Sequence, residues 1–155
     1  MLIAAALLLA GGYFFFGGGG PAPGRSVPLQ GNRHIRPGAD RSFRYNTDPP
    51  TSGPHYSSRA PWGIHDRPLS KGLQLHSLED GGVAVQYNCS GCPELVLKLR
   101  AIVRRYRERV ILAPYPTMKT RIALTAWGRI DSMEDFDEAR IVRFIDAYRG
   151  IDHHR

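Results

Sequence analysis

Two histidines and a methionine in turn-rich segments are the residues of this chain best suited to holding a metal ion. His55 ends the proline-rich run NTDPPTSGPH, His76 precedes a Gly-Gly step, and Met118 lies in a polar loop. Imidazole and thioether ligands together suit copper, because soft sulfur selects Cu(I) and imidazole accepts either oxidation state. We therefore expect a copper site at His55, His76 and Met118. Glu79 and Asp80 are further candidates as oxygen ligands, as groups orienting a histidine, or as turn residues.

The other histidines carry weaker signals. His34 stands alone in an extended arm, where a solvated side chain is expected. The pair His153–His154 lies in a short tail after Gly150, where it could bind metal weakly.

The chain has two cysteines, Cys89 and Cys92, in a C-x-x-C pattern. In an oxidising compartment a close pair forms a structural disulfide, and a following helix can also make such a pair redox active. A role as metal ligands would need partners from elsewhere, because structural zinc requires four ligands. The sequence leaves two roles open for this pair, a structural disulfide and a thiol-redox site.

Aromatic residues allow a third function, a non-catalytic module that docks a membrane-protein partner. Tyr56, Trp62 and Trp127 would then be surface anchors, although packing in the core is the alternative, above all for Trp127. The chain has no G-x-S-x-G, P-loop or H-E-x-x-H pattern. We therefore assign no catalytic residue and no organic cofactor site.

The elements that must position these residues follow from turn signals and periodicity. Residues 73–78 and 83–87 flank Glu79-Asp-Gly-Gly82 and predict a β-hairpin carrying His76 on one arm. Pro93 suits the first turn of a helix reaching about residue 107, with apolar residues at helical spacing. Short strands are expected at 110–113 and 122–127. Ser132 with Asp135 predicts the cap of a last amphipathic helix ending at Gly150.

The resulting β-β-α-β-β-α order predicts an α+β domain, a small sheet with two amphipathic helices packed on one face. With 155 residues, the chain has room for one domain. The expected organisation is a globular domain over 45–150, a Gly/Pro-rich extended linker over 21–44, and a tail over 151–155.

The first residues, MLIAAALLLAGGYFFF, carry no charge and with the next four glycines just reach the length of a membrane span. Residues 1–20 are therefore predicted to be a transmembrane anchor or a signal segment, with the domain on the periplasmic or extracellular side. The formal net charge is +7, but the basic residues are scattered and form no run interleaved with aromatics. Nucleic acid is not an expected partner.

Five motifs follow one another along the chain: Thr51-Ser-Gly-Pro-His-Tyr56, Trp62-Gly63, His76-Ser-Leu-Glu-Asp-Gly-Gly82, Ala113-Pro-Tyr-Pro116 and Leu124-Thr-Ala-Trp-Gly-Arg129. In this order they resemble a bacterial domain-of-unknown-function family of membrane-anchored extracytoplasmic proteins. The family pattern TSGPHY…LEHGG…LTAWGR has a second histidine where this chain has Asp80. The resemblance therefore points to His55 and His76 and argues against a three-histidine site that uses position 80. It implies membrane attachment and supplies no activity.

Overall fold

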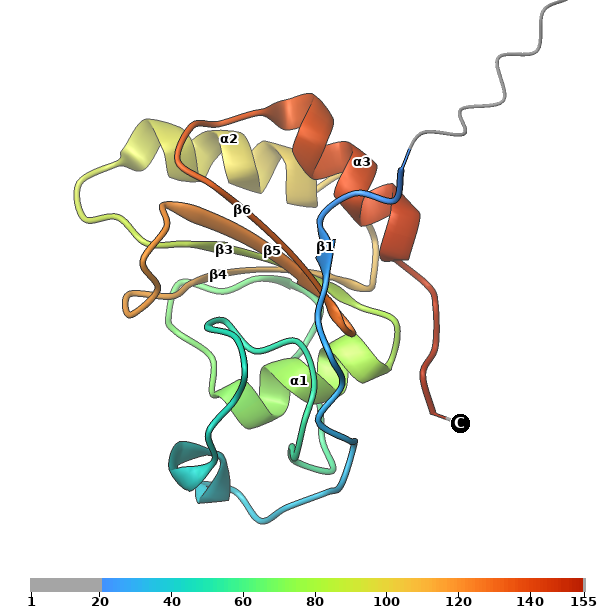
Figure 1. Cartoon of the computed structure of the whole chain (residues 1–155). Helices are drawn as coiled ribbons and strands as arrows, with labels where there is room; N and C mark the ends of the chain where they lie inside the picture. The colour runs from blue at the N-terminus through green and yellow to red at the C-terminus, as the bar shows by residue number, and fades with distance from the viewer. Residues whose placement is uncertain (1–20, 155) are drawn as a thin grey trace, which may run out of the picture.

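The structure is a computed structural model that describes residues 21–154 (Figure 1). Among these residues, six strands form one mixed sheet in the order β1-β6-β5-β3-β4-β2. The strands β2, β3 and β4 are parallel, whereas β5 and β6 run antiparallel to their neighbours. The elements in chain order are β1 Arg25–Ser26, the 3-10 helix η1 Ala39–Ser42, β2 Gly63–Ile64, α1 Lys71–Glu79, β3 Val83–Tyr87, α2 Pro93–Val103, β4 Val110–Pro114, β5 Ile122–Ala126, β6 Arg129–Met133 and α3 Glu138–Tyr148.

Helices cover both faces of the sheet (Figure 1). The side chains of α2 and α3 pack on one face with Val83 and Val85, and those of α1 pack on the other face with Ala84. Alternate residues of β3 thus point to opposite faces, as the two-residue period of a strand requires. Burial of both faces explains why β3 begins with three consecutive apolar residues, Val83 to Val85.

The predicted α+β class is confirmed, but the β-β-α-β-β-α order with helices on one face and the first arm of the predicted hairpin are wrong, because α1 is a third helix and covers the other face. Residues 71–79 form the helix α1, so His76 lies on a helix and not on a strand. Ser70 caps this helix by accepting a hydrogen bond from the Leu73 amide. Leu75 and Leu78, three residues apart, are 0% and 1% exposed and form the buried stripe. The weak alternation over 73–78 was a poorer guide than this cap and stripe.

The predicted start of the last helix is also wrong. Ser132 lies inside strand β6, and α3 begins at Glu138, where Asp137 accepts a hydrogen bond from the Arg140 amide. Asp131 on the same strand pairs with the Arg140 guanidinium, which ties β6 to α3. The residues that resemble a capping box at 132–135 therefore lie at the end of a strand and not at the start of a helix.

The segment 21–44, predicted as an extended linker, packs on the domain. Its strand β1 pairs with β6, Val27 is buried, and Asp40 in η1 is 4% exposed. The Tyr56 hydroxyl donates to the Asp40 carboxylate, and the Gly72 amide donates to the same side chain. These contacts bring the N-terminal arm against α1.

Residues 1–20, predicted as an anchor or signal segment, lie outside the described residues. Across residues 21–154, none of the helices has the length and apolar character needed to span a membrane.

Candidate metal centre

Four side chains from three separate segments converge beside the last turn of α1. His34 comes from the N-terminal arm, His55 from the proline-rich loop, and His76 and Glu79 from α1, and one ligand atom of each lies within 4.8 Å of the others. His76 and Glu79 are three residues apart, so the helix turns both toward the same side. The structure therefore brings the predicted pair His55 and His76 together, and Glu79 on α1 faces the loop that carries His55.

The loop that carries His55 is held from both sides. The His55 backbone carbonyl accepts from the Ile35 amide at 2.7 Å, and the His55 amide donates to the Arg33 carbonyl at 3.0 Å. The Tyr45 hydroxyl donates to the Pro54 carbonyl at 2.7 Å. His55 itself is 0% exposed. The pairing of the arm with this loop is what places His34 next to His55.

The tautomer of His55 follows from its neighbours. Its Nδ1 lies 2.8 Å from the Gly53 carbonyl oxygen, which can only accept, so Nδ1 carries the hydrogen. In the neutral ring, Nε2 then presents a lone pair to Glu79 Oε2 at 2.9 Å. Two acceptors cannot face each other at this distance without a proton or a cation between them. Ligand histidines are oriented in this way, by a hydrogen bond from the other ring nitrogen to a carbonyl.

Two buried polar atoms of this cluster have no hydrogen-bond partner within residues 21–154. They are Nδ1 of His76 and Oε1 of Glu79, and the Glu79 side chain is 1% exposed. Leaving a buried charged or polar group without a partner is costly, so native structures rarely contain one without a reason. A bound cation or an ordered water is the kind of partner that such atoms have in native structures.

The three imidazoles form a nearly equilateral triangle. Ring centroids are 5.2 Å apart for His34 and His55, 5.2 Å for His55 and His76, and 5.3 Å for His34 and His76. An ion bound by three imidazoles at about 2.0–2.1 Å in tetrahedral geometry holds their centroids roughly 5 Å apart. The spacing of the rings thus fits a three-histidine ion site, with Glu79 as the fourth ligand.

The electrostatics keep His76 in the form that binds metals. Burial lowers the pKa of His76, and the neighbouring histidines 55 and 34 lower it further, against the opposing effect of Asp80 and Glu79. A lowered pKa favours the neutral imidazole, and metal ions bind that form.

A second group adjoins the first through His76. His76 Nε2 lies 3.7 Å from Asp80 Oδ1, and His154 Nε2 lies 3.4 Å from the same oxygen and 3.3 Å from Glu79 Oε2. A hydrogen bond with Asp152, together with the carboxylates Glu79 and Asp80, raises the pKa of His154. Asp80 also pairs with Arg59. Asp80 is therefore close enough to take part, although it is not among the four residues of the first group.

The C-terminal tail is docked over this edge of the site. The Gly150 amide donates to the Gly81 carbonyl at 2.8 Å, and the His153 amide donates to the Glu79 carbonyl at 2.9 Å. The His153 ring stacks on Trp127 with 6.2 Å between centroids. The tail histidines, expected as weak metal binders, thus border the cluster.

Met118 is not brought to the histidines. It is 2% exposed and packs with Tyr115 and Ala123 at the start of β5. Trp127, whose ring contacts His55 edge-on at 5.7 Å, follows the other end of β5. Ala123 and Trp127 are separated by roughly 13 Å of extended chain. The sulfur ligand that favoured copper therefore lies away from the cluster.

The predicted surface anchors are mostly internal. Tyr56 is 7% exposed and Trp127 is 8% exposed, whereas Trp62 is half-buried beneath the Arg59 guanidinium. Anchoring of a partner by all three rings is thus incompatible with the structure.

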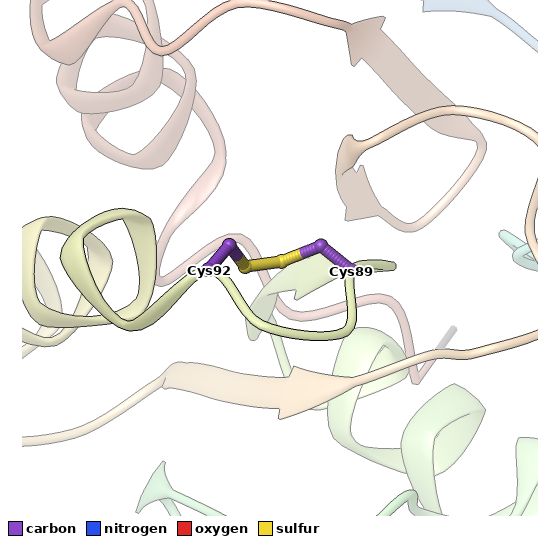
Figure 2. The surroundings of a disulfide bond; sticks show 2 residues. All are labelled: Cys89 and Cys92. Atoms are coloured by element: carbon purple, nitrogen blue, oxygen red, sulfur yellow. A yellow bond between two sulfur atoms is a disulfide. The ribbon is translucent and has the colours of Figure 1, made fainter.

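Cys89 and Cys92 form a disulfide in the loop between β3 and α2 (Figure 2). The histidine cluster lies at the amino end of β3, just after α1, and the disulfide follows its carboxyl end. The cysteines and the histidines are therefore two separate sites.

His34, expected as a solvated residue, and His154, expected at most as a weak metal binder, are the members of the two groups that were not predicted as site residues. Neither belongs to a recognisable motif. Each is exposed and lies in a terminal segment whose sequence shows no helical or strand periodicity. The four histidines of the two groups, 34, 55, 76 and 154, come from four different segments, so no single sequence motif contains them. Only their residue type pointed to a role in metal binding.

The fold and the cluster define an α+β domain with a histidine–carboxylate site between its N-terminal arm, one helix and its C-terminal tail. The chain belongs to the family described as protein of unknown function (DUF3105), whose sequence model matches residues 37–154. The resemblance expected from the motifs is thereby confirmed, and the match begins just after His34. Neither a curated protein nor a solved structure matches the chain.

Proposed function

We propose that this domain binds a divalent transition-metal ion through His34, His55, His76 and Glu79. The observation that carries the proposal is the contact of His55 Nε2, whose partner nitrogen Nδ1 is taken up by the Gly53 carbonyl, with the buried Glu79 carboxylate at 2.9 Å. A metal ion bonded to both atoms removes the conflict between two acceptors and neutralises a carboxylate that no lysine or arginine contacts within residues 21–154.

The donor set bears on the choice of ion. Three imidazole nitrogens and one carboxylate oxygen at tetrahedral spacing suit zinc. Copper(II) is the competing ion, because nitrogen and oxygen sites of this kind bind it most tightly in the divalent series. The expectation of Cu(I) depended on Met118, whose packing with Tyr115 and Ala123 leaves the cluster without sulfur.

Titration of the purified full chain with Zn(II), Cu(II) and Cu(I) tests the proposal. We expect one Zn(II) or Cu(II) bound per chain, and Cu(II) spectra showing several nitrogen ligands. His76→Ala should abolish this binding. His65→Ala is the matched control, because its Nε2 bonds the Pro61 carbonyl outside the cluster. Equal binding by both variants, or no stoichiometric binding by the wild-type chain, would refute the proposal.

The place of action is part of the same proposal. An uncharged apolar N-terminal segment favours attachment to a membrane, and the Cys89–Cys92 disulfide is typical of an oxidising, extracytoplasmic compartment. Membrane fractionation followed by protease digestion of intact cells tests this. The full chain should sediment with membranes and be cleaved from outside.

A further inference from the structure

The disulfide Cys89–Cys92 lies in the loop that follows a central strand of the sheet. It follows β3, which lies between β4 and β5 in the sheet. The chain continues from β3 through α2 to the parallel strand β4 on one side, while the antiparallel strand β5 pairs on the other side. The disulfide thus lies beyond the carboxyl end of a parallel strand, the end at which open α/β sheets place ligand and active sites.

The local structure is that of a redox-active pair. Cys92 is the N-cap residue of α2, and Pro93 occupies the first turn. The partial positive charge at a helix N-terminus stabilises a thiolate and lowers the pKa of a cysteine there. A C-x-x-C beside a β-α-β unit, here β3-α2-β4, is the thioredoxin-like arrangement.

A purely structural role explains this disulfide poorly. It closes a loop over a sequence separation of only 3, and short loops gain least from cross-linking. The segments on both sides are already fixed, because Leu95 and Leu99 of α2 are buried and the Asn88 amide donates to the Arg121 carbonyl.

The loop that holds the disulfide lies at the surface, within reach of a partner. Both cysteines are partly exposed, and Ser90 and Gly91 between them are fully on the surface. A pocket of about 410 Å³ lined by Cys92, Lys98 and Phe136 lies on one side. A second pocket of about 550 Å³, lined by Cys89 and Leu97, lies on the other, and Leu97 is 63% exposed. The second pocket suits an apolar side chain flanking a substrate cysteine, whereas the first, which Glu94, Arg121 and Asp135 also line, suits a polar or charged one.

We propose that Cys89 and Cys92 exchange disulfides with cysteine-containing protein substrates, a function beyond the metal site. A substrate thiolate attacks the Sγ of Cys89, the Cys89–Cys92 bond breaks, and Cys92 leaves as a thiolate at the N-terminus of α2. The second substrate thiol, once deprotonated, attacks the substrate sulfur of the mixed disulfide and releases Cys89. The substrate dithiol is oxidised to a disulfide by two electrons, and the protein disulfide is reduced to two thiols that take up the two protons.

Single-cysteine variants of the full chain test this proposal. Cys92→Ser retains the attacked sulfur of Cys89 but lacks the thiolate that resolves a mixed disulfide, so it should retain a cysteine peptide as a mixed disulfide at least about tenfold more than the reduced wild type does. The wild-type pair should be reduced by a glutathione buffer that leaves inert structural disulfides oxidised. Ser90→Ala is the matched control in the same loop and should behave as the wild type, and thermal melts report whether each variant folds.

Two results would overturn the proposal: a wild-type pair that stays oxidised in that buffer, or a folded Cys92→Ser variant that retains no more mixed disulfide than the wild type. The assays are run with a chelator present and repeated on His76→Ala. Because the histidines lie at the other end of β3, thiol exchange should be unchanged in both cases. Failure of the metal site and failure of the redox pair are thus distinguished.

Discussion

His55 Nε2 and Glu79 Oε2 lie 2.9 Å apart in a part of the domain where both side chains are almost fully excluded from solvent. His55 reaches this place from a proline-rich loop and Glu79 from the last turn of α1. Because the Gly53 carbonyl takes the only hydrogen of the neutral His55 ring, the interaction needs a proton or a metal ion. The predictions below follow from this relationship and from the groups that surround it.

Glu79→Gln should separate metal binding from folding. The amide is isosteric and can donate a hydrogen bond to His55 Nε2, so the metal-free variant should be at least as stable as the wild type. Its affinity for Zn(II) or Cu(II) should fall by at least about tenfold. Both proteins are melted at one metal concentration, a hundredfold above the dissociation constant of the wild type. There, metal should raise the wild-type Tm by on the order of 5–10 °C. A shift of equal size in Glu79→Gln would exclude Glu79 as a ligand.

His154→Ala tests the contribution of the C-terminal tail. His154 Nε2 lies 3.3 Å from Glu79 Oε2, but backbone hydrogen bonds of Gly150 and His153 dock the tail independently of this side chain. The variant should fold normally and bind metal more weakly than wild type, yet more tightly than His34→Ala, which removes one corner of the imidazole triangle. Competition titrations against a coloured chelator rank the three proteins. Tighter binding by His34→Ala than by His154→Ala would reverse the assignment of the ligands.

Met118→Leu should leave metal binding unchanged. The Met118 side chain packs with Tyr115 and Ala123, so a leucine of similar volume should cost less than about 1.5 kcal/mol of unfolding free energy. Copper titration of this variant checks the structure against the expectation from sequence. Loss of Cu(I) binding in a stably folded Met118→Leu protein would show that the methionine is a ligand after all.

Stability at high pH should depend on Tyr45. Burial, with the nearby Asp40 and Tyr56, raises the pKa of Tyr45 from 10.0 to about 12. The folded state therefore holds this proton more tightly than the unfolded state, and the resulting stability is complete below pH 10 and lost between pH 10 and 12.

Tyr45→Phe removes the titrating group and isolates its effect. The difference in unfolding free energy between wild type and variant should shrink by about 1 kcal/mol between pH 9 and 11.5, allowing for solvent screening of a partly exposed group. Urea unfolding of both proteins at the two pH values measures it. A difference that grows with pH would have the wrong sign for a raised pKa.

Much of this protein is determined locally, and those parts could be read from the sequence. Pro93 and the apolar spacing after it define α2, and the buried run Val83–Tyr87 defines β3. The α+β class, the family and the choice of His55 and His76 as candidate ligands follow from local patterns and motifs of this kind. Where two local signals competed, as over 73–78, the cap at Ser70 and the Leu75–Leu78 stripe decided for a helix.

The composition of the histidine cluster was decided only by the tertiary structure. His34 and His154 lie in chain ends without periodicity, and they join the site because the arm pairs with the loop at His55 and the tail pairs with Gly81 and Glu79. Met118 is not part of the cluster, because the length of β5 separates it from Trp127, whose ring contacts His55. Contacts between residues far apart in the chain depend on how the elements pack, and no local pattern of one sequence encodes them.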